Sequence, residues 1–480
     1  MRILLGSLVV VVLAATAMQS RTLLVGSGQA YANPALAARD AVPGDTILIL
    51  PGEYRGTFWI ENLNGTETSH IVIRGTDKAG VVFRGGTESM HFSDCSWLDI
   101  ENFTVTGQTG NGMNIDDGGT IDSPTHHIVI RGVVFTRMSA TGNNDMLKLS
   151  GLDHFRIEDC LFEFGATGGS GADMVGCHNG VFQRNTFREM GSNAIQAKGG
   201  TQFITITRNS FIRCGERALN LGGSTGLQFF RPLDAPFEAA DLYVYANVFL
   251  GSNTPIAYVG SVRVDVANNT IIEPVIWAFR VLQETVDPTR FAPCGQNVFR
   301  NNIVVYRSTL RSHVNIGGNT APETFTLSNN LWYNLDAPTA SKPNLGVMRE
   351  TASIYGDNPL LRDAVQADAT IGPTSPAVGK GLPIAGVDVD FAGNRFAANP
   401  SIGAFEGAEP TTSVAHNPMR SSRFSLEYGP TALRVRVFEP VTITWYNLLG
   451  RHLQTIQYEV GLHHTNFSGY MIAVEATITE

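Results

Sequence analysis

A short β-rich run that recurs along the chain constrains the fold more than any other feature. Most copies alternate apolar and polar residues, then place one or two asparagines before a closing apolar residue. Copies lie at 128–135, 155–162, 181–187, 204–211, 242–249, 264–271, 298–304 and 325–332. The first intervals are 27, 25 and 24 residues, counted over Phe135, Phe162, Phe187 and Phe211. Such a period is typical of solenoids, in which stacked coils bury the apolar side chains that a single coil would leave exposed.

The composition agrees with a β-rich chain that contains many turns. Fifty of the 480 residues are glycine, which is costly inside helices and well suited to turns with positive φ. The alternation within each run predicts half-buried strands. Its asparagines are expected at turns, where they tolerate the left-handed conformation and bond to the backbone. We predict purely structural ladder or turn roles for Asn185, Asn209, Asn247, Asn269, Asn302 and Asn330.

Segments at both ends of the repeats resemble the pectate-lyase-like right-handed β-helix superfamily. The segments that carry the resemblance are 41–47, 50–54, 375–381, 390–394 and 401–406. The resemblance extends over roughly residues 22–407. It implies an all-β fold, a right-handed single-stranded parallel β-helix, with a long flat side that holds a polysaccharide. We expect this β-helix domain to span residues 22–406.

The first residues predict export. Arg2 precedes an apolar run from Ile3 to Ala15, and small residues follow up to Ala17. This is the pattern of a secretory signal, so we expect a signal peptide at 1–17 and a secreted or surface-attached mature protein. No other stretch is long and apolar enough for a membrane span.

The composition changes after Glu406, which predicts a second domain. Residues 407–416 are expected to be a linker, and 417–480 a small C-terminal β-sandwich. Segments 441–451, 461–464 and 468–474 resemble the sorting domain of the type IX secretion system. That resemblance implies the secretion machinery as a partner. A small sandwich that binds carbohydrate or caps the solenoid is the alternative.

The net charge and the cysteine spacing argue against several classes of protein. With 34 basic and 43 acidic residues, the formal charge of −9 argues against a nucleic-acid or anionic-membrane binder. Five separated cysteines indicate neither a zinc cluster nor a dense disulfide framework. We expect a monomer without a clearly indicated cofactor. Carboxylates that could contribute to a calcium site are Asp116, Asp117, Asp388 and Asp390.

A second polar series lies between the repeats. We align it as four rungs, 145–150, 173–178, 193–198 and 217–222. Side chains alternate along a strand and neighbouring rungs lie ~4.8 Å apart, so this alignment predicts a contiguous patch. Its outward residues would be Lys148, Gln196, Asn220, His178 and Lys198. Val175 and Cys177 would point inward, and Asp145, Asp173 and Arg217 would reach the patch only from the turns before their strands.

Nearby loops add residues that suit a sugar-binding cleft. Aromatic rings stack on pyranoses, and arginine pairs with uronate carboxylates. We predict that substrate is bound by Lys148, Gln196, Asn220, Arg231, Tyr258, Trp277, Arg280 and Glu284. Alternatively, Arg231 and Arg280 brace their loops through Glu238 and Glu284.

The same patch suits β-elimination of a uronate polymer, which requires removal of the C5 proton. A lysine can act as base where burial or cations lower its pKa, and an arginine can stabilise the anion. We predict that Lys198 is the base. The other catalytic candidates are Arg217, His178, Asp173 and Asp145.

The strand end around Lys198 resembles the Lys-Ser element of the alginate and chondroitin B lyase family, which implies the same basic role. The family's arginine position falls on Gly222, so Arg217 would have to replace it from the start of the rung. The two glutamates that hold calcium in that family are also absent. The residues there are Asn193 and Gln196.

Two other interpretations stay open. A glycoside hydrolase or epimerase on this scaffold would use Asp145 and Asp173, which direct stacking would place near the retaining separation of about 5 Å. A non-catalytic surface protein would only bind carbohydrate. Structural roles are also open, since Asp145 and Asp173 could bond turn backbones and His178 could be a satisfied polar residue.

Overall fold

The computed structural model describes residues 20–407 and six strands between residues 424 and 477. The predicted signal peptide at 1–17, and the predicted linker apart from residue 407, lie outside the described residues. The chain divides into two compact units, residues 1–409 and 410–480.

Three long parallel sheets form the first unit. Sheet A has 18 strands, β1 (Thr22–Val25), β2 (Thr46–Ile49), β5 (Ile71–Gly75), β8 (Ser96–Glu101), β11 (Thr125–Arg131), β14 (Leu152–Glu158), β17 (His178–Gln183), β20 (Thr201–Gln202), β21 (Thr205–Thr207), β24 (Ala239–Ala240), β25 (Tyr243–Tyr245), β28 (Ser261–Val262), β29 (Asp265–Ala267), β32 (Cys294–Gly295), β33 (Val298–Arg300), β36 (Thr320–Ala321), β37 (Thr326–Ser328) and β39 (Glu350–Thr351).

Sheet B has 12 strands, β3 (Gly52–Tyr54), β6 (Val81–Arg84), β9 (Thr104–Thr106), β12 (Val134–Thr136), β15 (Leu161–Glu163), β18 (Thr186–Met190), β22 (Ser210–Cys214), β26 (Val248–Leu250), β30 (Thr270–Ile272), β34 (Ile303–Tyr306), β38 (Leu331–Asn334) and β40 (Ile354–Tyr355). Sheet C has 10 strands, β4 (Phe58–Glu61), β7 (Met90–Ser93), β10 (Met113–Asp116), β13 (Leu147–Ser150), β16 (Ser170–Val175), β19 (Asn193–Lys198), β23 (Arg217–Gly222), β27 (Thr254–Val259), β31 (Trp277–Leu282) and β35 (Ser312–Ile316).

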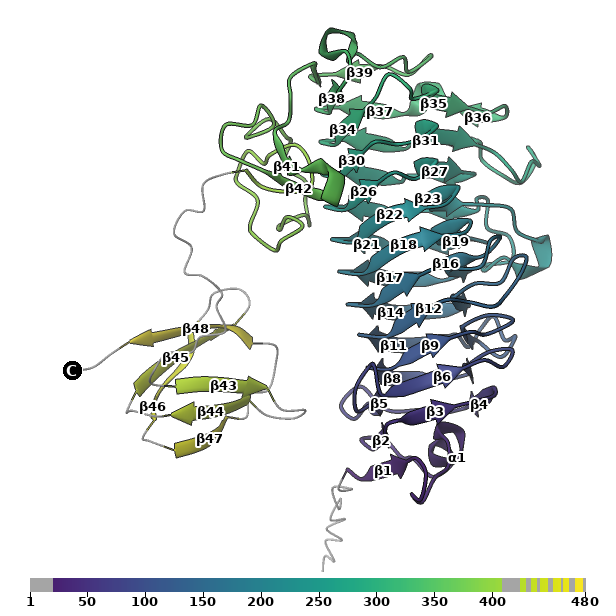
Figure 1. Cartoon of the computed structure of the whole chain (residues 1–480), viewed down its shortest axis with the longest axis vertical. Helices are drawn as coiled ribbons and strands as arrows, with labels where there is room; N and C mark the ends of the chain where they lie inside the picture. Colours follow the sequence, from purple (N-terminus) through teal and green to yellow (C-terminus); the bar gives the residue numbers. More distant parts are fainter. Residues whose placement is uncertain are drawn as a thin grey trace, which may run out of the picture. The chain divides into compact units, whose positions relative to one another are not determined.

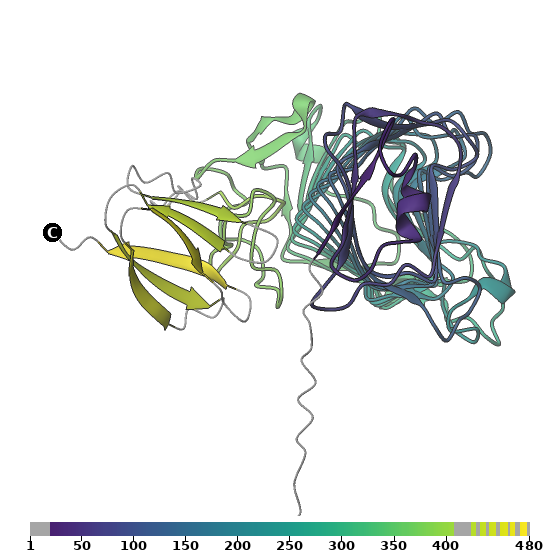
Figure 2. The ribbon, with the colours of Figure 1, turned by 90° about the horizontal axis from the view of Figure 1, so that it is seen from below.

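The chain visits the three sheets in turn, so successive coils stack in parallel. Figure 1 shows this stack from β1 upward, and Figure 2 shows the coils superimposed when seen along the stack. The predicted all-β solenoid is therefore confirmed, and its fold is a parallel β-helix.

Each recurring run is a pair of strands joined at a corner. The run 155–162, for example, comprises most of β14 and the start of β15. The closing phenylalanines point into the interior and stack from coil to coil, with ring centroids 4.8 Å apart for Phe135 and Phe162 and 4.5 Å apart for Phe162 and Phe187. The period of the sequence is therefore the period of this aromatic stack.

The asparagines between sheets A and B form the predicted structural ladder. Asn209 Oδ1 accepts hydrogen bonds from the backbone N–H and the side-chain amide of Asn185 (2.9 and 3.0 Å). Asn185 Nδ2 also donates to the Ile157 carbonyl (2.8 Å). The residue before the asparagine adopts the left-handed conformation, as Arg184 does with φ 56°. The asparagine side chain thus bonds neighbouring coils, and the positive φ falls one residue earlier than the sequence indicated.

Segments outside the three sheets pack against the coil stack at two places. Helix α1 (Pro34–Ala38) is capped at its N-terminus by Asn33, whose side chain accepts the Leu36 N–H (3.1 Å), and the helix lies across the first coils (Figure 2). The segment after β40 contains the short hairpin of β41 (Leu361–Asp363) and β42 (Asp368–Ile371) and then packs against the later coils. There, the Ala404 N–H donates to Thr270 Oγ1 (3.0 Å).

Four short 3-10 helices lie in the connections of this unit, η1 (Leu227–Phe229), η2 (Pro322–Thr324), η3 (Pro338–Ala340) and η4 (Ala364–Gln366). All five cysteines are buried and unpaired. Among the residues described, none of the helices has both the length and the apolar character to cross a membrane.

The second unit contains two antiparallel three-stranded sheets. The first consists of β43 (Phe424–Tyr428), β44 (Leu433–Val437) and β47 (Gly461–Thr465). The second consists of β45 (Val441–Asn447), β46 (His452–Tyr458) and β48 (Met471–Thr477). The three segments that resemble a sorting domain contribute to β45, β47 and β48.

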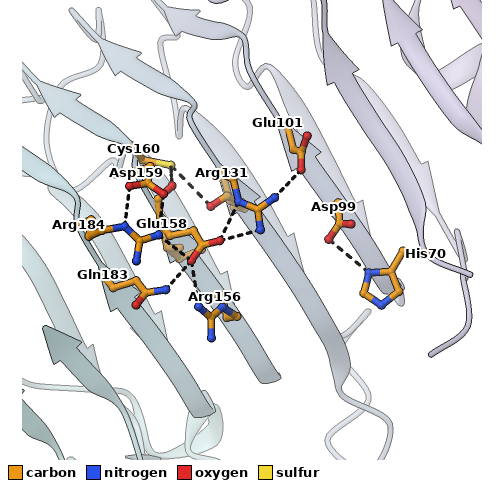
Figure 3. A network of polar contacts seen from close by, with 12 residues as sticks. His70, Asp99, Glu101, Arg131, Arg156, Glu158, Asp159, Cys160, Gln183 and Arg184 are labelled. Carbon is orange, nitrogen blue, oxygen red and sulfur yellow. Dashed lines mark hydrogen bonds and ion pairs between the residues drawn. The ribbon is translucent and has the colours of Figure 1, made fainter. Parts of the chain in front are cut away.

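The outer face of sheet A carries an ion-pair network that spans several coils (Figure 3). Arg131 contacts Glu101 on one neighbouring strand and Glu158 on the other (2.9 and 2.8 Å). Burial alone would raise the pKa of Glu158, but hydrogen bonds from Gln183, Arg131 and Arg156 lower it to about 2. These arginines are already paired with carboxylates, so this part of the face does not present surplus positive charge.

Candidate functional site

Sheet C presents one row of outward residues in unbroken register. We call it the outward row; its members are Trp59, His91, Asn114, Lys148, Asp173, Gln196, Asn220, Ala257, Arg280 and Asn315. Consecutive members lie on adjacent coils, about 4.8 Å apart along the stack. The row brings together three of the predicted outward residues, Lys148, Gln196 and Asn220.

Asp173 lies on this row, whereas the sequence alignment had placed it level with Asp145. Strand β16 begins at Ser170, so Asp173 pairs with Lys148 and Gln196. Its neighbours Ala172 and Met174 are fully buried and point inward. The predicted direct stacking of Asp145 on Asp173 is therefore wrong.

Because the register of β16 differs from the predicted one, Val175 also lies on a different face from the one predicted. Val175 pairs with Ser150 and Lys198 at an outward position, so the prediction that it points inward is wrong. Cys177 is buried, as predicted.

Asp145, Lys148, Asp173 and Lys198 form a compact set that we call the Lys–Asp cluster. Asp173 Oδ2 contacts the ammonium groups of both lysines, Lys148 directly and Lys198 at 3.3 Å. The Asp173 side chain is 0% exposed, and those of Lys148 and Lys198 are 22% and 12% exposed. Two cations thus share one fully buried carboxylate oxygen.

Asp145 completes the cluster from the turn before β13. Its Oδ2 lies 3.7 Å from Lys148 Nζ, and its Oδ1 accepts the Ser170 N–H (2.8 Å). Burial and the neighbouring Asp173 carboxylate raise the pKa of Asp145 to about 7, although Lys148 opposes this effect. Asp145 thus combines the backbone-bonding role that the sequence left open with a direct place beside the lysines.

Lys148 carries a stable positive charge. Burial lowers its pKa, but the carboxylates of Asp173 and Asp145 more than compensate and hold that pKa above its ordinary value. An ammonium group of this kind binds an anion and does not accept a proton near neutral pH. Of the two lysines, Lys198 is therefore the better candidate for a base.

Both lysines line a pocket of about 550 Å³. Its walls are sheet C, a short loop at 117–121 and a longer loop at 224–231; the lining residues are Asp117, Gly119, Ile121, Lys148, Ser150, Gly151, Val175, Lys198, Ser224, Thr225, Gly226, Gln228, Phe229, Phe230 and Arg231. Asp173 lies behind the two lysines and does not line the pocket. A ligand in this pocket would therefore contact the two lysine side chains and not the Asp173 carboxylate behind them.

The longer loop is fixed by a buried carboxylate. Glu238 is 0% exposed and accepts hydrogen bonds from the Gly199 N–H (2.9 Å), the Thr225 N–H (2.9 Å), Thr225 Oγ1 (2.7 Å) and Thr285 Oγ1 (2.5 Å). A Cβ atom at Gly200 would lie 2.4 Å from the Arg231 carbonyl oxygen, so only glycine permits this close approach. Glu238 thus ties the corner after Lys198 to the wall of the pocket.

Arg231 braces the same loop through a different partner from the one the sequence indicated. Its guanidinium group makes two 2.8 Å hydrogen bonds to Asp153, not to Glu238. Burial alone would raise the pKa of Asp153, but hydrogen bonds from Arg231 and His178 hold it well below its ordinary value. Arg231 lines the pocket, but its charge is neutralised by Asp153, which does not line the pocket.

His178 does not lie on the predicted patch. It begins β17 in sheet A, and its ring nitrogens lie 3.1 Å from the Gly200 carbonyl oxygen and 3.3 Å from an Arg231 nitrogen. Its predicted outward position on sheet C is therefore wrong. These contacts favour the alternative of a satisfied polar residue that supports the loop.

The remaining polar candidates lie further along sheet C. Arg217 contacts Asn220 Oδ1 (2.9 Å) and Glu284 Oε1 (2.7 Å). Arg280 donates to Asn315 Oδ1 (2.9 Å), and its guanidinium carbon lies 4.4 Å from the centroid of the Trp277 ring. Glu284 therefore pairs with Arg217, while Arg280 rests on Trp277.

Tyr258 is a core residue and not a binding residue. Its side chain is 0% exposed, and its hydroxyl donates to the Val298 carbonyl (3.1 Å). The prediction that Tyr258 contacts substrate is wrong because it occupies an inward position of β27, level with Leu221 and Val281.

The first members of the outward row were not among the residues predicted from the sequence. Trp59 is 56% exposed and stacks on the His91 ring, with centroids 4.0 Å apart and planes at 22°. Strand Met90–Ser93 alternates apolar and polar residues like the later rungs, whereas Phe58, Trp59 and Ile60 form an unbroken apolar run that gives no such signal.

A metal site is not evident in the part of the chain that the structure describes. There, three or more His, Cys, Asp or Glu side chains do not converge in an arrangement that could hold a metal ion. Asp116 is engaged by His91 (2.7 Å) and Ser93 (2.6 Å), and Asp390 accepts the backbone N–H groups of Asn394 and Glu406.

Comparisons with known proteins agree with the fold. Residues 59–271 match the family described as the right handed beta helix region. Pectate lyase Pel9A is a similar solved structure, with a TM-score of 0.50 and 12% identity over 82% of this chain and 98% of that one.

Two other solved structures are less similar in shape. The alginate lyase from Paenibacillus sp. strain FPU-7 gives a TM-score of 0.42 with 17% identity, over 68% of this chain and 99% of that one. A mannuronic acid specific polysaccharide family 6 lyase from human gut microbiota gives 0.46 with 12% identity, over 72% and 89%. No curated protein sequence matches the chain. At 12% identity, the likeness to pectate lyase Pel9A supports a common fold and no more.

Proposed function

We propose that this protein is a polysaccharide lyase that cleaves a uronate-containing glycan by β-elimination. The observation that carries the proposal is the Lys–Asp cluster, in which two lysines share one buried carboxylate and line the same pocket. A uronate ring needs a cation for its carboxylate and a base for its C5 proton. Lys148 and Lys198 offer these two groups side by side.

The two lysines take different roles in this mechanism. Lys148 lies between Asp173 and Asp145 and stays charged, so it pairs with the uronate carboxylate and makes the C5–H bond more acidic. Lys198 makes its ion contact with Asp173 alone, at 3.3 Å, and accepts the C5 proton in its neutral form. The electron pair of the broken C5–H bond forms the C4–C5 double bond, and the C4–O bond breaks. The departing oxygen takes a proton from Lys198 or from water.

Asp173 and Glu238 act as positioning residues in this proposal. Asp173 holds both ammonium groups from behind, and Glu238 fixes the Gly199 backbone beside Lys198. Gln196 continues the outward row with an amide group that can donate to sugar oxygens, whereas Asn220 is only 2% exposed and accepts a hydrogen bond from Arg217. Arg217 lies beside Asn220 and provides a further cation on this face.

The fold is compatible with this activity, since pectate lyase Pel9A shares it. Fold likeness alone does not assign a reaction, because function depends on the residues of the site. A hydrolase or an epimerase could use the same face, and so could a protein that only binds glycan. The reaction products distinguish these functions.

The test is ultraviolet absorbance of the unsaturated product, with alginate, pectin, chondroitin, dermatan, heparin and ulvan as substrates. We expect absorbance to rise with at least one glycan, and Lys198→Ala to lower the rate by about 10²–10⁴-fold, the usual contribution of a general base. Lys78→Ala, at an exposed lysine outside the pocket, is the control and should keep the full rate.

No absorbance with any glycan would exclude lyase activity on this panel. Reducing ends without absorbance would indicate hydrolysis, and an altered uronate composition without cleavage would indicate epimerisation. An active Lys198→Ala variant would remove Lys198 as the base.

We further propose that the protein is exported to the cell surface or medium, with the type IX machinery as partner. Support comes from the apolar run after Arg2 and the resemblance of segments 441–451, 461–464 and 468–474 to a sorting domain.

A further inference from the structure

An exposed tryptophan begins the outward row, at a distance from the Lys–Asp cluster. Trp59 lies on β4, and its register partners lead through His91 and Asn114 to Lys148. Trp59 is thus three rungs from Lys148, roughly 14 Å at the usual rung spacing. A pyranose unit is about as long as one rung, so both positions can lie under one oligosaccharide.

His91 covers the face of the Trp59 ring that is turned toward Lys148, so the open face of the indole is turned away from Lys148, toward the start of the row. The two rings stack at 4.0 Å, and Trp59 remains 56% exposed. The imidazole is itself fixed, since its nitrogens lie 2.8 Å from Glu88 Oε2 and 2.7 Å from Asp116 Oδ2. Asn114 Nδ2 also donates to Asp116 Oδ2 (3.0 Å). The aromatic platform is therefore held in place before any ligand binds.

The charge around this platform differs from that around the lysines. Two carboxylates, Glu88 and Asp116, flank one histidine, so this end of the row has no surplus positive charge. A uronate carboxylate placed there would meet two like charges. An uncharged sugar ring would instead stack its C–H face on the indole and offer hydroxyl groups to the polar residues.

We propose that Trp59, supported by His91, forms a distal subsite for an uncharged pyranose ring of the glycan whose uronate unit lies at Lys148. This inference rests on the proposed function for the position of the uronate. It names the substrate class as a heteroglycan in which uncharged sugars accompany uronates. A polymer made only of uronate units would place a carboxylate beside Glu88 and Asp116.

Affinity electrophoresis tests this subsite without turnover. All chains carry Lys198→Ala so that the glycan stays intact, and native gels contain either chondroitin, whose uronates alternate with uncharged rings, or polygalacturonate. We expect stronger retardation by chondroitin. Adding Trp59→Ala should weaken chondroitin binding about tenfold, which corresponds to about 1.4 kcal/mol.

Two companion variants separate stacking from misfolding. Trp59→Phe keeps an aromatic face and should retain most of the binding. Phe203→Ala removes another exposed aromatic side chain, 47% exposed and outside sheet C, and should bind like its parent.

The outcomes distinguish this inference from the proposed function. If Trp59→Ala binds chondroitin as well as its parent, the subsite is refuted. If it loses affinity equally for both glycans, the preference for an uncharged ring is refuted. If Trp59→Ala loses binding to chondroitin alone while the chain with Lys198 intact yields no unsaturated product, the subsite stands and the lyase proposal fails.

Discussion

Replacing Asp173 by asparagine tests whether the Lys–Asp cluster is held together as the structure indicates. The substitution keeps the size of the side chain and removes the charge that Lys148 and Lys198 share. At 3.3 Å and an effective dielectric constant of ~20, the attraction between Lys198 and Asp173 is about 5 kcal/mol. Desolvation of the three groups offsets part of this attraction in the folded protein.

The expected loss follows from the charges that remain. Asp173→Asn leaves two lysines, 22% and 12% exposed, beside a neutral amide. Breaking a buried ion pair by removing one partner costs about 3–5 kcal/mol, so we expect the free energy of unfolding to fall by that amount. Urea unfolding of the full chain, followed by circular dichroism, measures the change.

A surface pair provides the matched control. Asp241 pairs with Arg263 at 2.7 Å, but the Arg263 side chain is 47% exposed. Exposed pairs contribute at most about 1 kcal/mol, so Asp241→Asn should have a small effect. If Asp173→Asn costs no more than Asp241→Asn, the cluster does not stabilise the fold and our account of it is wrong.

Two further predictions concern the groups around the cluster. Asp145 has a folded pKa of about 7, above the ordinary 3.8, so its contribution to stability is complete below about pH 4 and is lost as the pH rises through 7. Asp145→Asn should remove this loss, which urea unfolding between pH 4 and 8 would show; an unchanged pH profile would contradict the assignment. In Glu238→Gln, the new amide cannot accept all four hydrogen bonds. We therefore expect the free energy of unfolding to fall by about 1–3 kcal/mol. The substitution should also lower kcat on the active glycan, and an unaltered kcat would show that the Gly199 corner does not position Lys198.

The fold could be predicted from the sequence because successive coils place the same kind of side chain at the same inward position. Phe135, Phe162 and Phe187 occupy the same inward position of successive coils and stack within 4.5–4.8 Å. Their spacing in the sequence therefore reports the length of a coil directly. The ladder asparagines were equally visible, since each one occupies the same corner.

The site could be predicted only where the alternation is regular. Gln196 and Asn220 lie on strands with clear inward neighbours, and their shared face was predicted correctly. The start of β16 was hidden because Ser170 and Gly171 give no apolar signal, and Val175 has an outward position despite its apolar side chain. An error in register moves side chains to the wrong face, which is how Asp173 was misplaced.

Contacts between distant segments could not be predicted from local patterns. Arg231 and Asp153 are 78 residues apart, and their pairing depends on how the loop folds back over the corner at Gly176. Trp59 and His91 were not predicted for another reason. Their coils precede the recurring runs from which the four rungs of the polar series were aligned.

The asparagine ladder has a consequence for how the length of such a molecule can change. From Asn185 to Asn302, each asparagine bonds to the asparagine of the next corner in the same way, as Asn247 does with Asn269 (2.9 and 3.0 Å). Duplication or loss of one whole coil in this region would join two equivalent corners and leave no amide without its acceptor. Where that coil lies between Lys198 and Arg280, the event would move these two residues relative to each other by one rung. The face that carries the outward row could thus be lengthened or shortened by gene rearrangement one rung at a time, while the interior stays the same.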